Sequence, residues 1–250
     1  MSVSETAQPP CYLVFGATGG IGASLCRRLS ARGAKVILAA RNVDKLQPLA
    51  DELAATFIIT DATRMEQVDA CIEQAVRENG RVDGIANCIG SLILKPAHST
   101  TDAEWQATVA ANLTSAFAVV RAGAKAMMST GGSIVLVSSA AGRIGLANHE
   151  AIAAVKAGVI GLTLSAAATY APRGIRVNCV APGLVKTPMT SRLTNNEMSL
   201  KASTAMHALG RIGEPGDVAS AIDWLLSSEQ SWVTGQVLGV DGGLGSILAR

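Results

Sequence analysis

The segment Cys11-Tyr12-Leu13-Val14-Phe15-Gly16-Ala17-Thr18-Gly19-Gly20-Ile21-Gly22 decides the fold of this chain. A short apolar run leads directly into a glycine-rich turn, and a segment with helical periodicity follows from Ile21. In this context the glycines allow a tight turn that approaches a pyrophosphate, and the first N–H groups of the helix attract its charge. A tight turn without a ligand is the simpler alternative. We expect a dinucleotide to contact Gly16, Thr18, Gly19, Gly20, Ile21 and Gly22.

Short apolar runs alternate with helical segments along the whole chain. Because the runs are continuously apolar, they predict strands covered on both faces, as in a parallel sheet between two layers of helices. The expected strands are Cys11–Phe15, Lys35–Ala40, Thr56–Thr60, Gly84–Asn87, Ser133–Ser138, Arg176–Val180 and Gln236–Val240. The expected helices are Ile21–Ala31, Val43–Leu53, Arg64–Glu78, Asp102–Met128, Ala151–Tyr170 and Pro215–Ser227. The pattern indicates an α/β fold, a doubly wound parallel sheet of Rossmann type, in a single domain over residues 11–250 after an N-terminal extension over 1–10.

Composition narrows the classes of protein. The 250 residues are 49% hydrophobic and 16% charged, with a formal net charge of +2. No Lys/Arg run suggests nucleic acid or an anionic membrane, and no uninterrupted apolar stretch of about 18 residues predicts a membrane span. The five cysteines fit neither a metal site nor a disulfide framework, and residues 1–10 lack the pattern of a signal peptide. We therefore expect a cytoplasmic protein without a metal, and the apolar excess hints at buried subunit surface.

The end of the second expected strand bears on the choice of cofactor. An acidic side chain there would bind the adenosine ribose hydroxyls and repel a 2′-phosphate, but the chain has Ala40 followed by Arg41. Because a guanidinium matches a phosphate well, we favour NADP(H) over NAD(H), with a solvated arginine as the alternative. Asp61 follows the third expected strand, where it either accepts a hydrogen bond from the adenine amino group or caps the helix from Arg64.

Residues 186–211 form a polar segment without a predicted strand. The segment carries three methionines and is either a lid over a substrate pocket or a pair of surface helices. We expect His98 and His207 to flank the mouth of that pocket as ordinary surface histidines.

Together these features resemble the short-chain dehydrogenase/reductase family over nearly the whole chain. The family's glycine signature matches Gly16, Gly20 and Gly22, with Phe15 in place of a threonine. Further matches follow in the family's order: Asn87-Cys88-Ile89-Gly90, Asn112, Ser139, Lys156, Arg176–Gly183 and Val240–Gly243. The resemblance implies that the cofactor also contacts Asn87, Gly90, Lys156, Pro182, Gly183, Val185 and Thr187. Among members, the chain is most similar to bacterial 3-oxoacyl carrier-protein reductases, which implies a homotetramer or homodimer built through the two long helices.

The resemblance also assigns catalytic roles to Ser139, Asn112 and Lys156. In the family the serine positions the substrate carbonyl and the asparagine holds a water. The lysine binds the nicotinamide ribose and lowers the pKa of a tyrosine four residues before it, which exchanges the proton. Here Ile152 stands four residues before Lys156, and isoleucine cannot donate a proton. The separation of Ser139 from Lys156 is that of the family, so an alignment slip does not explain the difference.

Two neighbouring side chains are alternative proton donors. His149 lies seven residues before Lys156, nearly two helical turns, and therefore on the same face. The spacing is similar to that of tyrosine and lysine in the enoyl carrier-protein reductases of the family, and histidine donates protons near neutral pH. Glu150 would serve if burial raised its pKa. Otherwise both are ordinary polar residues of a first helical turn.

Two functions are consistent with these residues. The first is an NADP(H)-dependent oxidoreductase that reduces a carbonyl or a conjugated enoyl group of a small, mostly apolar substrate. Reduction of a conjugated C=C bond places the proton on carbon, so Ser139 and Lys156 need only stabilise the carbonyl oxygen. The second is a catalytically silent nucleotide-binding protein, a sensor or partner subunit, because Ile152 removes the usual proton donor.

Overall fold

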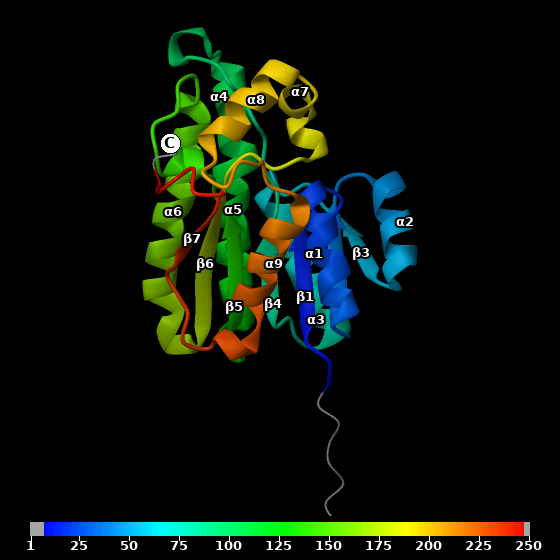
Figure 1. The fold of residues 1–250 in the computed structure, drawn as a ribbon. Coiled ribbons are helices and arrows are strands. Elements are labelled where there is room, and N and C mark those ends of the chain that lie inside the picture. Colours follow the sequence, from blue (N-terminus) through cyan, green and yellow to red (C-terminus); the bar gives the residue numbers. More distant parts are fainter. Residues whose placement is uncertain (1–7, 248–250) are drawn as a thin grey trace, which may run out of the picture.

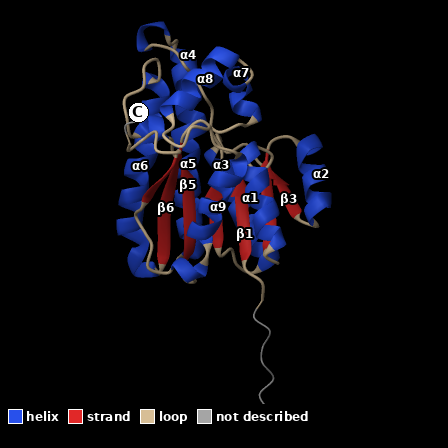
Figure 2. Cartoon of the chain, in the orientation of Figure 1, coloured by secondary structure: helices blue, strands red, loops and turns tan. Residues whose placement is uncertain are grey.

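In the computed structural model, which describes residues 8–247, the chain forms a seven-stranded parallel sheet with the order β3-β2-β1-β4-β5-β6-β7 (Figures 1 and 2). The strands are β1 (Cys11–Phe15), β2 (Lys35–Ala40), β3 (Thr56–Ile59), β4 (Gly84–Asn87), β5 (Gly132–Val137), β6 (Ile175–Pro182) and β7 (Val237–Val240). The predicted doubly wound α/β class is confirmed. Most of the expected N-terminal extension, residues 1–7, lies outside the described residues. The strand order reverses between β1 and β4, which is where such sheets bind ligands at their carboxyl edge.

The register of the strands brings several loops together at that edge. Phe15, the last residue of β1, pairs with Ala39 of β2 on one side and with Asn87 of β4 on the other. Val137, the last residue of β5, pairs with Val180 of β6. The glycine loop after β1 therefore begins beside the loops that follow β2 and β4, and the serines after β5 lie beside the end of β6.

Two helical layers cover the sheet, and each encloses an apolar core. Helices α1, α2 and α9 cover one face, and α3, α5 and α6 cover the other (Figure 1). The helices are α1 (Gly20–Ala31), α2 (Val43–Leu53), α3 (Met65–Asn79), α4 (Asp102–Val109), α5 (Ser115–Met127), α6 (Glu150–Tyr170), α7 (Ser191–Thr194), α8 (Glu197–Met206) and α9 (Pro215–Leu226). In β1, Leu13 and Phe15 point into one core while Tyr12 and Val14 point into the other. This alternation between two cores explains the continuously apolar strands.

The helix predicted as one regular piece from Asp102 to Met128 is interrupted by a π-helical segment at Ala110–Thr114, between α4 and α5. The prediction of a regular helix is wrong at this point. The apolar pattern stays helical on either side and shifts in phase by one residue only, so local periodicity does not reveal the π-helical segment. Asn112, in the middle of the segment, is buried.

One helical stretch, Glu150–Arg173, is long and apolar enough to cross a membrane by length and composition alone. Its most apolar window has a mean hydropathy of 1.7, and 44% of that window is buried within the structure. Here α6 packs against β6 and α5, with Val155, Val159 and Ala166 buried. The stretch is a core helix of this fold, and its apolar character follows from that packing.

Residues 186–211 lie above the carboxyl ends of the strands and contain α7 and α8 (Figure 1). A 3-10 turn at Pro188–Thr190 precedes the two helices. At the start of the segment, the N–H of Lys186 donates to the carbonyl oxygen of Gly213 at 2.8 Å. The helix pair expected as one interpretation of the segment is therefore present.

Candidate nucleotide-binding and active site

Close glycine contacts shape the turn after β1. Gly16 has a φ of +73°, in the left-handed region that glycine adopts without strain. A Cβ on Gly22 would collide with the carbonyl oxygen of Gly16, so the first turn of α1 packs directly on the loop. A Cβ on Gly20 would lie 2.8 Å from Cγ2 of Thr187, which comes from the segment after β6. No side chain of the described residues caps α1, so its first N–H groups are available to an anion.

A cavity of about 180 Å³ opens at the carboxyl ends of the central strands. It is called the cofactor cavity below. The structure brings many of the predicted site residues together around it: Gly19, Gly20, Ile21, Gly22, Gly90, Ser139, Ile152, Lys156, Pro182, Gly183, Val185 and Thr187. The other predicted residues do not line it: Gly16, Thr18, Arg41, Asp61, Asn87, Asn112 and His149. The glycine cradle and the uncapped helix amides suit the phosphates of a pyridine dinucleotide.

Asn87 and Asn112 fix the loop after β4 from behind. The side-chain oxygen of Asn87 accepts from the N–H of Ile89 at 3.2 Å, and its nitrogen donates to Oγ of Ser115 at 3.4 Å. Asn112 donates to Oγ of Ser91 at 2.9 Å and accepts from the N–H of Ser91 at 3.2 Å. Ser91 is a site residue that the sequence analysis missed, because no motif marks it. These bonds hold the loop that forms one wall of the cofactor cavity.

Lys156 is buried on α6 and faces the same cavity. Nζ of Lys156 donates to the carbonyl oxygen of Val137 at 2.9 Å. The backbone carbonyl oxygen of Lys156 accepts from Oγ of Ser138 at 2.7 Å. A Cβ on Gly90 would lie 3.4 Å from Nζ. Burial lowers the pKa of Lys156 to about 8. An ammonium carries three donors, so this group retains hydrogen-bonding capacity toward a ligand, and its charge is lost as the pH rises through about 8.

Ser139 and Ile152 border the cofactor cavity beside Lys156. Oγ of Ser139 accepts from the N–H of Ala141 at 3.1 Å, which opens the short turn after β5. Ile152 lies one helical turn before Lys156, and only 3% of it is exposed. The two tyrosines of the chain lie in β1 and at the end of α6, and neither lines this cavity. The side chain on α6 that borders the cavity one turn before Lys156 is therefore a hydrocarbon.

A second cavity of about 350 Å³ adjoins the first and is called the substrate cavity below. The two cavities share Ser139 and Ile152. The large aliphatic side chains of its lining are Leu92, Leu94, Leu146, Ile152, Leu184, Leu193, Met206 and Leu244. Its polar side chains are Ser139, His149, Thr190, Ser203 and His207. No Lys, Arg, Asp or Glu is among the residues that line it within the described chain.

His149 lies at the start of α6 and lines the substrate cavity. Its Nδ1 lies 2.7 Å from the carbonyl oxygen of Ala147, which can only accept, so Nδ1 carries the proton and Nε2 is the remaining nitrogen. Glu150 is exposed and lines neither cavity. The burial that Glu150 would need as a proton donor is therefore missing.

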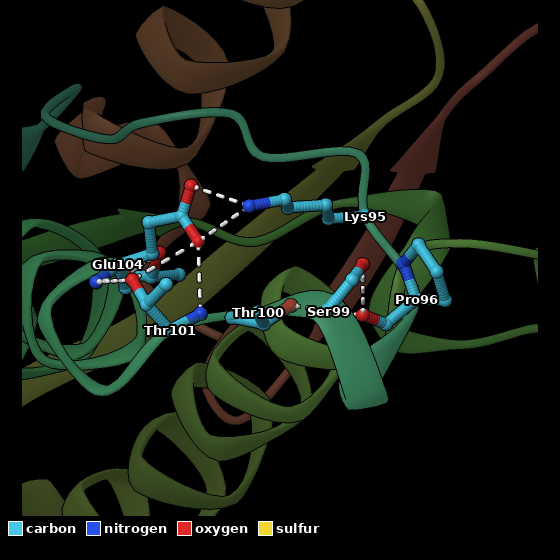
Figure 3. Close-up of polar contacts among 7 residues, drawn as sticks. Lys95, Pro96, Ser99, Thr100, Thr101 and Glu104 are labelled. Atoms are coloured by element: carbon cyan, nitrogen blue, oxygen red, sulfur yellow. Dashed lines mark hydrogen bonds and ion pairs between the residues drawn. The ribbon is translucent and has the colours of Figure 1, made fainter.

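The loop after β4, which also lines the substrate cavity, is fastened to the start of α4 (Figure 3). Nζ of Lys95 forms an ion pair with Glu104 at 2.8 Å, and Thr101 and Glu104 form a capping box at the start of α4. The hydrogen bonds from Lys95 and Thr101 lower the pKa of Glu104 to about 2. The N–H of Lys95 donates to the carbonyl oxygen of Asn148 at 2.8 Å, so this loop is held to the loop that precedes α6.

Arg41 and Asp61 lie outside both cavities, after β2 and β3. Arg41 is exposed and forms no ion pair within the described chain. Although burial opposes it, hydrogen bonds from Thr63 and the charges of Arg41 and Arg64 lower the pKa of Asp61. The carboxylate accepts both the N–H and the hydroxyl of Thr63, at 3.1 and 2.8 Å. Asp61 thus closes a turn before α3 rather than capping the helix itself.

His207 corrects the expectation of a surface histidine, since only 3% of it is exposed. Leu184 donates its N–H to Nε2 at 3.1 Å, and Nδ1 lies 2.7 Å from the carbonyl oxygen of Ser203. Leu184 is 23 residues away in the sequence, and Ser203 contributes only a backbone carbonyl. No local sequence pattern therefore predicts the burial of His207. His98 is exposed, as expected, in a 3-10 turn at Ala97–Ser99.

The structure also bears on metals and disulfides. Over residues 8–247, no cluster of three or more His, Cys, Asp or Glu side chains is arranged to hold a metal ion. Cys11, Cys26, Cys71, Cys88 and Cys179 are all free thiols. Burial raises the pKa of Cys88, which lines the cofactor cavity, to about 12, so this thiol is a poor nucleophile.

The sheet, the glycine loop and the serine–lysine pair define a pyridine-nucleotide-dependent oxidoreductase fold. A family model described as Enoyl-(Acyl carrier protein) reductase matches residues 16–245. A trans-4-hydroxycyclohexanecarboxylate dehydrogenase from Sinomonas cyclohexanicum is 36% identical, covering 96% of this chain and 95% of its own. The 3-oxoacyl-acyl-carrier-protein reductase FabG of Thermotoga maritima is 37% identical, covering 93% and 96%. The structure of ElxO with NADP bound has a TM-score of 0.90 at 28% identity, covering 96% and 100%. The chain belongs to the short-chain dehydrogenase/reductase family.

Proposed function

We propose that this protein is an NADP(H)-dependent oxidoreductase that reduces a carbonyl or conjugated enoyl group of a small, uncharged, mostly apolar substrate. The observation that carries the proposal is the junction of the two cavities, which share Ser139 and Ile152, with Lys156 beside them in the cofactor cavity. A polar pair at that junction suits the activation of one substrate oxygen. The remaining walls suit hydrocarbon.

The cofactor preference rests on Arg41. An exposed guanidinium that forms no ion pair within residues 8–247, directly after β2, is suited to the 2′-phosphate of NADP(H). When bound, NADP(H) supplies the hydride. We assign its phosphates to the loop over 16–22 and its nicotinamide end to Gly90, Pro182, Gly183, Val185 and Thr187, of which all but Gly90 follow or end β6. We assign four further residues to the same cofactor-binding site: Gly16, Thr18, Asp61 and Asn87. NADP bound to ElxO is in keeping with this preference.

The substrate class follows from the substrate cavity. No Lys or Arg lines it in the described chain, so a carboxylate buried there would lack a permanently charged partner. We therefore expect a neutral substrate, unlike the hydroxycyclohexanecarboxylate in the name of one relative. The segment 186–211 acts as its lid, because Thr190, Leu193, Ser203 and Met206 belong to it and line the cavity.

Ile152 decides the type of chemistry. We assign it to the place of the family's tyrosine, one helical turn before Lys156. With a hydrocarbon there, reduction of a conjugated C=C bond is favoured over reduction of a ketone. Hydride adds to the β-carbon, the α-carbon takes a proton, and the carbonyl oxygen is never protonated by residue 152. Ser139 and Lys156 stabilise the negative charge on that oxygen, and Asn112 holds the loop that faces it.

His149 is the proposed source of the proton. Its ring lines the substrate cavity with Ser139 and Ile152, and the hydrogen bond to Ala147 leaves Nε2 free. As the imidazolium, His149 would donate from Nε2, directly or through one water. The proton then returns to the ring from solvent at the exposed side of the residue.

A second candidate is a catalytically silent NADP(H)-binding sensor or partner subunit. The buried hydrocarbon at residue 152 favours it, since the glycine loop, Ser139 and Lys156 still surround the cofactor cavity. A tyrosine-to-phenylalanine variant of ElxO has been solved with NADPH bound, so in that protein the loss of a tyrosine hydroxyl is compatible with binding.

Cofactor oxidation separates the candidates. Purified protein is titrated with NADPH and then mixed with neutral ketones and their α,β-unsaturated counterparts. Oxidation of NADPH with the enones supports the enzyme, whereas tight binding without turnover supports the silent protein. Absence of binding to either NADPH or NADH would refute both.

We also propose a cytoplasmic homotetramer or homodimer. The outer faces of α5 and α6 expose large apolar side chains, with Phe117 at 46% and Leu164 at 50% exposure. Burial of that surface between copies would be favourable. The five free thiols are in keeping with a reducing compartment.

A further inference from the structure

We propose that His207 is a positioning residue that clamps the substrate lid to the cofactor-binding loop, so that binding of the cofactor orders the lid. The inference deepens the proposed function and rests on it for the identity of the two ligands. The clamp itself is argued from the contacts of one buried ring.

The imidazole bridges two separate parts of the chain. Nδ1 lies 2.7 Å from the carbonyl oxygen of Ser203 in α8, and Nε2 lies 3.1 Å from the backbone nitrogen of Leu184 after β6. A carbonyl only accepts and an N–H only donates, so both bonds form together only when the ring is neutral with its proton on Nδ1. At 3% exposure, no bulk water replaces either bond. The ring is therefore committed to joining the lid to the loop.

The neighbouring backbone is shaped around this ring. A Cβ on Gly183 would lie 2.5 Å from Nε2, and one on Gly242 would lie 3.5 Å from the ring carbon Cδ2. The ring thus packs directly against a glycine at the point where β6 ends. Any side chain at residue 183 would displace it. The loop and the histidine form one fitted unit.

The two parts joined by His207 serve the two cavities. The loop over 182–187 lines the cofactor cavity with Pro182, Val185 and Thr187. Helix α8 lines the substrate cavity with Ser203 and Met206. His207 is thus a physical connection between a wall of each cavity.

The lid is tied to the same loop at its other end. Oγ1 of Thr190, in the turn before α7, donates to the carbonyl oxygen of Val185 at 2.5 Å and accepts the N–H of Thr187 at 3.0 Å, as part of a capping box. The segment from Thr190 to His207 is therefore anchored at both ends to residues 184–187. A cofactor that fixes those residues restrains the lid at two points, and the coupling must act in both directions.

Hydrogen exchange tests the clamp. Exchange in peptides over 182–187 and 191–206 is compared with and without NADPH in the wild type and three variants. His207→Phe keeps a buried ring but removes both bonds, whereas His207→Gln retains one acceptor and one donor. His98→Phe is the matched control at an exposed histidine.

In wild type and His98→Phe, NADPH is expected to slow exchange in both segments. In His207→Phe, lid exchange should be about tenfold faster without cofactor, and NADPH should slow only the loop. His207→Gln should recover most of the response. A lid that responds to NADPH in His207→Phe as in wild type overturns the proposal.

Two provisions keep the outcome decisive. If circular dichroism shows that His207→Phe is unfolded, His207→Asn is used, since its shorter side chain cannot span from Ser203 to Leu184. If wild type binds no NADPH, the proposed function fails, but the clamp is still judged without cofactor. Lid exchange in His207→Phe equal to wild type would then refute it.

Discussion

Replacement of Ile152 by tyrosine is the sharpest perturbation of this site. Residue 152 lies one helical turn before Lys156 and borders both cavities, together with Ser139. A tyrosine there would extend its ring toward a cavity of about 350 Å³, which has room for the added atoms. Its phenol would lie near a buried ammonium, which favours the phenolate and so lowers the pKa of the phenol.

The size of the expected gain follows from general acid catalysis. A positioned proton donor typically contributes about 10²- to 10⁴-fold to a rate, which corresponds to roughly 3 to 5 kcal/mol of activation free energy. Ketone reduction needs that donor at oxygen, whereas C=C reduction does not. We therefore expect Ile152→Tyr to raise turnover of a neutral ketone by about two orders of magnitude or more, with a much smaller effect on the corresponding enone.

The assay compares wild type, Ile152→Tyr and Ile152→Phe at saturating NADPH, following cofactor absorbance with a cyclic ketone and its α,β-unsaturated counterpart. The phenylalanine variant has the same ring without the hydroxyl, so it isolates the proton donor from packing. Equal ketone turnover in the two variants, with both folded and both binding NADPH like wild type, would show that a missing hydroxyl is not what limits this site.

Two further predictions concern the cofactor and the buried lysine. Arg41→Ala should weaken NADPH binding by roughly 10- to 100-fold, the value of one hydrogen bond to a charged group, and leave NADH nearly unaffected. Fluorescence titration of both nucleotides checks this, with Arg27→Ala at a distant ion pair as control; an equal loss for NADPH and NADH would contradict it. Since burial lowers the pKa of Lys156 from 10.5 to about 8, the unfolded chain binds a proton that the folded chain lacks between these pH values, so this group makes stability rise with pH across that window. Below about pH 8 the buried ammonium costs the folded state its full amount, on the order of 3 kcal/mol. In urea unfolding at about pH 7, Lys156→Met should therefore be more stable than wild type. This difference in unfolding free energy should narrow toward about pH 10. A gap that is independent of pH would show that desolvation of the ammonium is not its cause.

The fold could be predicted from the sequence because each strand is apolar on both faces. The bounds of β1, β2 and β4 agree with the predicted ones. Strand β6 is longer than expected, reaching Pro182, because Ala181 and Pro182 pair with β7. Pairing with a strand that lies more than fifty residues away extends a strand beyond its own local pattern, so the sequence does not reveal this end.

The candidate site could be predicted only where short motifs carry it. The glycine loop, Ser139 and Lys156 lie around one cavity, as their order along the chain indicates. His207 lies at the substrate cavity as expected, but its burial could not be predicted, because that burial depends on a glycine contact and a backbone donor from β6 and its loop. The contact of Arg41 with the 2′-phosphate of NADP(H) remains a prediction, since no contact within the described structure tests it.

The π-helical turn at Ala110–Thr114 lets one continuous helical stretch both contact the loop after β4 and pack on the sheet. An i→i+5 turn holds one residue more than an α turn, so everything beyond it is rotated by about 100° relative to a regular helix. Asn112 can therefore reach Ser91 in the loop after β4, while the apolar stripe from Ala116 onward faces the sheet. One extra residue in a helical turn can thus direct a polar side chain toward a site, while the face of the helix that packs on the sheet keeps its apolar residues.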